Sequence, residues 1–266
     1  MQPESEIAAM HLRSFNRFQA AALHLCFSLL LALLVFCLFR FLWYPDGLFG
    51  VAAAGKLLLL VTGVDVVIGP LLTLVVFNPK KKSLPFDLAV IAVLQVSALA
   101  YGVQVMLDSR PIFLVGVTDR FELVMANELA DADLAKATQP EFGQRSWTGP
   151  VLVGAKRPAS SAARSQLLFD TLEGKSDLDR RPEYYVPYSE ISADLLKRGT
   201  HLSHWGSVDH PEVKRALAYV RQRQLDPGQV LVLPLKTRLR FAALLIDPAA
   251  GKPLRAFDFD PYEVHP

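Results

Sequence analysis

The sequence predicts a membrane protein in which three N-terminal transmembrane α-helices precede a soluble α+β domain with an antiparallel sheet. One observation behind this prediction is composition: hydrophobic residues make up 52% of the 266 residues, and their excess is concentrated before residue 108. The other observation is the order of the predicted secondary-structure segments after residue 108. There, strand-like and helix-like segments alternate, and the chain closes on three strand-like segments, as expected for an α+β domain.

Three runs of about 20 residues, the length that spans a bilayer, carry almost no charge. They cover residues 18–39, 57–79 and 88–107. A helix of a soluble protein would show a polar face every three to four residues, which these runs lack. The first run is also longer than the ~7–15 apolar residues of a cleaved signal peptide. We expect a cytoplasmic tail at 1–17 and a transmembrane region at 18–107, with helices at about 18–43, 56–77 and 86–107.

Lysines between the second and third runs set the predicted orientation. Lys80, Lys81 and Lys82 form this loop, whereas the loop after the first run is rich in Gly and Ala. Because short loops rich in Lys and Arg stay in the cytoplasm, the N-terminus and the lysine loop are expected inside. Residues 108–266 then form a periplasmic domain, and the protein is expected to be a multi-pass protein of the bacterial inner membrane.

The predicted outer domain follows the third helix without a linker. Apolar and β-branched runs predict strands, and amphipathic runs bounded by a cap residue, Pro or Gly predict helices. The strands are expected at 110–117, 120–126, 150–158, 229–237, 239–247 and 253–261, and the helices at 127–137, 161–174, 189–199 and 210–225. The last three strands are close in sequence, which favours an antiparallel meander.

Charge and motifs exclude several functions. The chain has 28 Lys and Arg against 26 Asp and Glu, a net charge of +2, so no basic field for nucleic acid is present. Gly-rich phosphate loops and nucleophile motifs are absent. Cys26 and Cys37 stand roughly 16 Å apart along one helix, too far to form a disulfide. We therefore predict no catalytic residue and no cofactor.

A cluster of histidines in the outer domain is the best candidate for metal chemistry. It contains His201, His204, Asp209 and His210. A zinc site needs three or four ligands at fixed distances, and a His-x-x-His pair alone is weak evidence. A solvated loop before a helix starting at Pro211 accounts for the residues equally well, so no metal is predicted. A membrane-anchored, metal-dependent periplasmic enzyme remains the alternative function, together with a ligand-binding sensor domain.

The most informative feature of the transmembrane region is a carboxylate inside the second apolar run. A charged side chain there costs about 2.5–3.5 kcal/mol on insertion scales, so Asp65 is expected to face protein or water. With Asp65, three small or hydroxyl residues form one helical stripe: Thr62, Gly69 and Thr73. Such stripes mark close contacts between membrane helices.

Three interpretations of this stripe stay open. It packs internally, with Asp65 hydrogen-bonded to Gln95 of the third helix or to Thr62; or it docks the transmembrane helix of another protein; or it belongs to a proton path. The proton path is the weakest, because the sequence offers no evident relay of further ionisable groups.

Tyrosines at 184, 185 and 188 are candidates for a periplasmic contact. Tyr184, Tyr185 and Tyr188 lie in the segment RPEYYVPY, which is dense in aromatic residues and Pro. Exposed Tyr side chains are common on protein-binding surfaces, and a buried strand accounts for the segment equally well.

Three segments resemble the TfpX/TfpZ family of type IV pilin accessory proteins. They are the second and third apolar runs with their loop (57–103), RPIFLVGVTDRFELVMANEL (110–129) and RPEYYVPY (181–188). The resemblance implies an inner-membrane accessory protein, or chaperone, that promotes accumulation or assembly of its cognate type IV pilin. It implies no catalytic residue. On this resemblance, the partner helix of the Asp65 stripe would be the apolar N-terminal helix of the major pilin.

Overall fold

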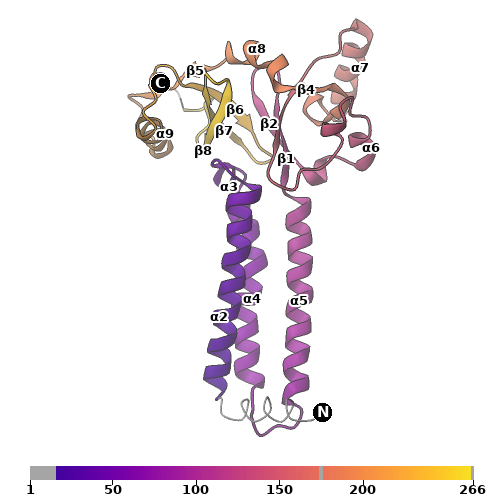
Figure 1. The fold of residues 1–266 in the computed structure, drawn as a ribbon, viewed down its shortest axis with the longest axis vertical. Helices are drawn as coiled ribbons and strands as arrows, with labels where there is room; N and C mark the ends of the chain where they lie inside the picture. The colour runs from indigo at the N-terminus through magenta and orange to yellow at the C-terminus, as the bar shows by residue number, and fades with distance from the viewer. Residues whose placement is uncertain (1–15, 174–175, 265–266) are drawn as a thin grey trace. The chain divides into compact units, whose positions relative to one another are not determined.

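The computed structural model describes residues 16–173 and 176–264. Within them the chain forms two compact units. One, which we call the helical unit, comprises residues 16–39 and 55–107. The other, which we call the sheet domain, combines the loop 40–54 with the described residues from 108 onward (Figure 1).

The helical unit consists of three helices that are long and apolar enough to cross a membrane. Helix α2 (Arg17–Cys37) begins with a reciprocal cap, in which Asn16 and Gln19 each accept a hydrogen bond from the other's backbone N–H. It runs on as a π-helical segment, Leu38–Trp43. Helix α4 spans Ala54–Val76 and α5 spans Leu84–Asp108. The three predicted membrane helices are confirmed.

The sheet domain is built on one eight-stranded sheet in the order β4-β3-β1-β2-β6-β7-β8, with β5 paired to β6. The strands are β1 (Pro111–Gly116), β2 (Phe121–Met125), β3 (Val151–Ala155), β4 (Tyr185–Pro187), β5 (Thr200–His201), β6 (Leu231–Lys236), β7 (Phe241–Asp247) and β8 (Lys252–Phe257). The predicted meander is confirmed, because β6, β7 and β8 pair antiparallel in sequence order. The sheet as a whole is mixed, since β1 pairs parallel with β3 and β2 with β6.

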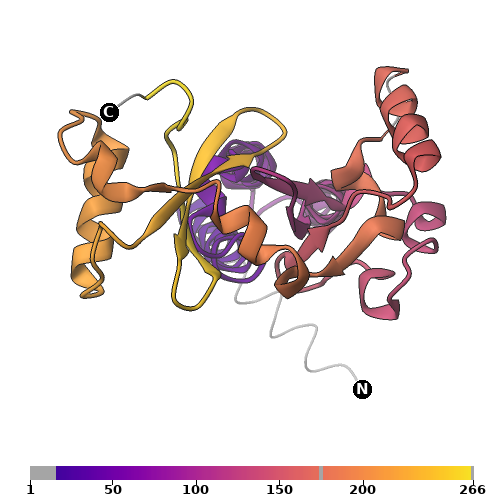
Figure 2. The same ribbon diagram turned by 90° about the horizontal axis from the view of Figure 1, so that it is seen from above.

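Five short or medium helices accompany this sheet. They are α3 (Leu48–Val51), α6 (Asp131–Leu134), α7 (Ser161–Leu172), α8 (Ser192–Leu196) and α9 (Pro211–Gln222). Helix α9 lies at one end of the sheet, and α6 and α7 lie at the other (Figure 2). Short 3₁₀ turns occur at Ala126–Glu128, Pro140–Phe142, Leu178–Arg180, Pro182–Tyr184, Tyr188–Glu190 and Leu202–Trp205. One buried core joins β1 and β3 to the turns around Tyr185, and a second lies between α9 and the meander.

The loop between the first two membrane helices is an integral part of the sheet domain. The Trp43 indole N–H donates to the Trp147 carbonyl at 3.1 Å, and the Tyr44 hydroxyl donates to the Ser109 carbonyl at 2.7 Å. Further along the loop, the Asp46 carbonyl accepts a hydrogen bond from the Ala256 N–H of β8 at 2.8 Å. Gly47 has φ +85°, and a Cβ there would lie 2.1 Å from the Ala256 carbonyl oxygen, so only glycine fits.

Candidate functional site

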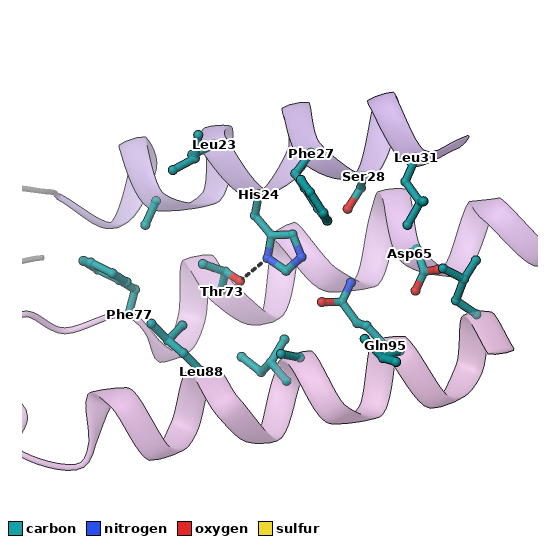
Figure 3. Close-up of a pocket in the computed structure, with 15 residues that line it drawn as sticks. Leu23, His24, Phe27, Ser28, Leu31, Asp65, Thr73, Phe77, Leu88 and Gln95 are labelled. Carbon is teal, nitrogen blue, oxygen red and sulfur yellow. Dashed lines mark hydrogen bonds between the residues drawn. The ribbon is translucent and has the colours of Figure 1, made fainter. Parts of the chain in front are cut away.

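A cavity of about 680 Å³ lies between the three helices of the helical unit (Figure 3). Most of its lining is apolar, and five polar side chains interrupt it. The lining residues are Ala20, Leu23, His24, Phe27, Ser28, Leu31, Asp65, Thr73, Phe77, Leu88, Ile91, Ala92, Gln95, Val96 and Leu99. Since α2, α4 and α5 all contribute, the cavity belongs to the bundle rather than to one helix face.

His24 and Thr73 join α2 to α4 at one side of the cavity. The His24 Nδ1 and the Thr73 Oγ1 are 2.6 Å apart, within hydrogen-bonding distance (Figure 3). Thr73 is only 4% exposed, and so is Ser28, which lies one helical turn after His24 on α2. His24 is therefore a second ionisable residue in the lining of the cavity, which was not identified from the sequence. A signal was available in the sequence, since a His followed one turn later by a Ser is unusual in an apolar run.

Gly69 is the point where polar groups of the other two helices come together on α4. A Cβ built on Gly69 would lie 2.0 Å from the Gln95 amide nitrogen and 3.0 Å from the His24 Nε2. The absence of a side chain therefore lets the Gln95 side chain of α5 lie directly on the α4 backbone. This is the close approach that small residues permit between membrane helices.

Asp65 is the middle residue of the 23-residue helix α4. It is 6% exposed, and its Oδ1 has no hydrogen-bond partner in the described part of the chain. Thr62, one of its two predicted partners, donates instead to the Leu58 carbonyl of its own helix at 2.9 Å. Leaving such a group unpaired costs about 1–3 kcal/mol, so a buried atom of this kind needs a reason.

The stripe on α4 is thus divided between two environments. Gly69 and Thr73 contact α5 and α2, as the internal-packing interpretation expects. Asp65 borders the cavity with one oxygen unpaired among the described residues. Contact of the stripe with a partner helix stays a prediction, and Asp65 is the member that remains available for it.

The residues of the histidine cluster have separate local roles. The His210 side chain accepts a hydrogen bond from the Glu212 N–H and caps α9, while Asp209 forms an ion pair with Lys214. The ring centres of His201 and His204 are 6.4 Å apart. Across residues 16–173 and 176–264, no three His, Cys, Asp or Glu side chains are grouped so that they could hold a metal ion.

The three tyrosines differ in exposure. Tyr185 is fully buried, and its hydroxyl donates to the Asp179 carbonyl, so its assignment to a partner-contact surface is wrong. The apolar core around β1 and β3 accounts for this burial. Tyr188 packs on Phe121 with ring centres 5.9 Å apart, and burial raises its pKa to about 12. Tyr184 and Tyr188 keep partial exposure, so a partner contact at these two stays a prediction.

Glu122 of β2 is the centre of a second charged cluster, inside the sheet domain. It is 2% exposed, accepts a hydrogen bond from the Arg120 Nε at 2.7 Å, and pairs with Lys236 of β6 at 3.3 Å. Burial and the nearby Asp179 carboxylate raise the pKa of Glu122 above its ordinary value. Because cations from β6 and the β1–β2 turn both contact it, this cluster ties strands together.

Three helices able to cross a bilayer and a mixed-sheet domain define a membrane-anchored α+β protein. The chain is 28% identical over 221 residues to the fimbrial assembly protein of serogroup E1 from Dichelobacter nodosus, covering 81% of this chain and 84% of that protein. The serogroup I protein of the same organism gives the same values. The fimbrial assembly protein of serogroups C1 and C2 is 32% identical over 119 residues, 44% of this chain and 91% of that protein. The chain belongs to the family of these fimbrial assembly proteins.

No protein-family model matches the chain, and no solved structure is significantly similar to it.

Proposed function

We propose that this protein is a non-enzymatic accessory protein, or chaperone, of type IV pilus assembly. It promotes the accumulation or assembly of its cognate pilin, as the resemblance to the TfpX/TfpZ family implies. Its family membership supports a role in pilus assembly, because the relatives are named fimbrial assembly proteins. It resides in the bacterial inner membrane, with the N-terminus and Lys80–Lys82 in the cytoplasm and residues 108–266 in the periplasm.

The observation that carries this proposal is the cavity between the membrane helices. It offers apolar walls to a helix within the bilayer, together with a buried polar group, Asp65, at the middle of α4. A pilin subunit that waits in the membrane by its apolar N-terminal helix needs such a surface. The pilin helix lies against α2 and α5 and leaves when the subunit joins the pilus.

Cysteine crosslinking tests the contact, with Cys26 and Cys37 replaced by Ser. Phe27 lines the cavity and is 66% exposed; Leu30 of the same helix is also 66% exposed but does not line it. Phe27→Cys is expected to crosslink to a cysteine in the apolar helix of the strain's major pilin, and Leu30→Cys is not. Equal crosslinking from both positions, or none from Phe27→Cys, would contradict docking in the cavity.

Deletion of the gene tests the role itself. Pilin level and surface pili are expected to fall and to return when the gene is restored. An unchanged pilin level and unchanged surface pili would show that the protein has no accessory role.

Reporter fusions test the orientation: a fusion at residue 82 should read as cytoplasmic and one at residue 120 as periplasmic.

A further inference from the structure

We infer that the helix bound in the cavity presents a hydrogen-bond donor to Asp65 in the middle of the bilayer. This inference rests on the proposed function and adds the chemistry of the partner to it. It means that the partner is recognised by a polar side chain at one depth, in addition to its apolar surface.

The first step is that Asp65 is a polar group of the cavity with a buried acceptor still to be satisfied. Thr73 and His24 are within hydrogen-bonding distance of each other. Asp65, in contrast, is only 6% exposed, and its Oδ1 is without a partner among the described residues. An ionised carboxylate oxygen only accepts hydrogen bonds, and a protonated carboxyl keeps acceptor capacity, so a donor can satisfy Asp65 in either state.

The second step concerns which occupant can supply that donor. Lipid chains fit an apolar cavity but carry no donor. Lipid head groups do carry donors, yet Asp65 is the middle residue of α4 and stands roughly 16 Å along the helix from either end. That distance matches the half-thickness of the hydrocarbon core, about 15 Å, so head groups do not reach it. A transmembrane helix with a donor side chain does.

The third step is the arrangement around Asp65. The cavity walls come from apolar side chains such as Leu31, Ile91 and Leu99, which exclude water and strengthen any hydrogen bond made there. An unpaired acceptor costs stability in the empty protein and gains a partner only in the complex. Such an acceptor therefore favours occupancy by a helix that carries a donor over one that does not.

The test compares Asp65, Asp65→Asn and Asp65→Leu in the Phe27→Cys protein, with crosslinked pilin as the readout. Asp65→Leu is expected to reduce crosslinked pilin about tenfold. Asp65→Asn keeps a carbonyl acceptor of the same shape and is expected to retain most of the crosslinked pilin. Unchanged crosslinking in Asp65→Leu would overturn the inference, because water or the protein itself would then satisfy the carboxyl.

Thermal stability of the pilin-free protein in detergent provides the second readout. If Asp65 is an unpaired acceptor, Asp65→Leu raises the unfolding temperature of the empty protein while it weakens pilin capture. A lower unfolding temperature would overturn the inference, since it would show an internal partner. Failure of the proposed function looks different: Phe27→Cys would then capture no pilin even with Asp65 in place.

Discussion

At the residue scale, Glu122 is the ionisable group whose environment leads to a pH prediction. Its side chain is buried, with Arg120 and Lys236 as cationic neighbours and Asp179 as an acidic one. Burial and Asp179 raise its pKa above the ordinary value of 4.5, so between the unfolded and folded pKa values the folded domain holds a proton that the unfolded chain has released. The stability from this group is therefore full below the unfolded pKa and is lost as pH rises through the folded pKa.

Glu122→Gln replaces the carboxyl with a neutral amide of similar shape at every pH. It is therefore expected to remove the loss of stability with rising pH that comes from this group. As pH rises from about 4.5, the unfolding temperature of the wild type should fall relative to that of the variant. Fluorescence can follow the change, because all three tryptophans, at 43, 147 and 205, lie in the sheet domain. Parallel curves for the two proteins would show that the ion pairs with Arg120 and Lys236 offset the burial of Glu122.

At the element scale, the packing of the three membrane helices depends on where α4 lacks a side chain. Gly69 and Gly63 both belong to α4, but a Cβ on Gly63 meets nothing within 4 Å, whereas one on Gly69 meets Gln95 and His24. Gly69→Leu is expected to destabilise the bundle by about 1–3 kcal/mol through overpacking, and Gly63→Leu to be nearly neutral.

Labelling of Cys37 on heating can measure this difference. Cys37 is a partly buried free thiol of α2, and Cys26 would be replaced by Ser so that one thiol reports. The Gly69→Leu protein should label at a lower temperature than the Gly63→Leu protein. If the two variants label alike, the α4–α5 contact at Gln95 contributes little to holding the helices together.

The same elements show what the sequence could predict. The membrane helices were predictable because a charge-free run of about 20 residues matches the thickness of a bilayer and lacks the polar face of a soluble helix. The β6–β8 meander was predictable because its strands pair with their neighbours in sequence. The parallel pairs β1–β3 and β2–β6 were not, since they join segments separated by long connections and depend on how whole cores pack. For the same reason, the burial of Tyr185 could not be distinguished from exposure.

Part of the candidate site was also predictable. The spacing of Thr62, Asp65, Gly69 and Thr73 identified one helical face, and Gln95 was placed opposite it. The contact between His24 and Thr73 was not predictable, because the length and lack of charge that indicate a membrane helix do not show which side chains of two helices meet. That Asp65 would keep an unpaired oxygen depends on rotamers and neighbouring helices, which spacing alone does not determine.

At the scale of the whole molecule, the loop 40–54 gives the sheet domain part of its core. Trp43 is 4% exposed, while Phe41, two residues earlier, is 69% exposed. Trp43→Ala is expected to destabilise the sheet domain by about 3–5 kcal/mol, through lost packing and an unpaired Trp147 carbonyl. Phe41→Ala should leave its stability unchanged. Limited proteolysis of the full chain in membranes can compare them, and equal protection would mean that the loop is dispensable for the domain.

The hydrogen bond between Ala256 and Asp46 also has a consequence for biosynthesis. Asp46 leaves the ribosome with the loop between the first two membrane helices, whereas β8 follows every other strand of the sheet. The edge of the sheet is therefore completed only after all of its other strands have been synthesised, and pairing over such separations is slow to form. A truncated chain would leave the edge of β7 uncovered, a ready template for aggregation or a signal for degradation. Chains cut before β8 are therefore expected to accumulate less in the membrane than the full chain.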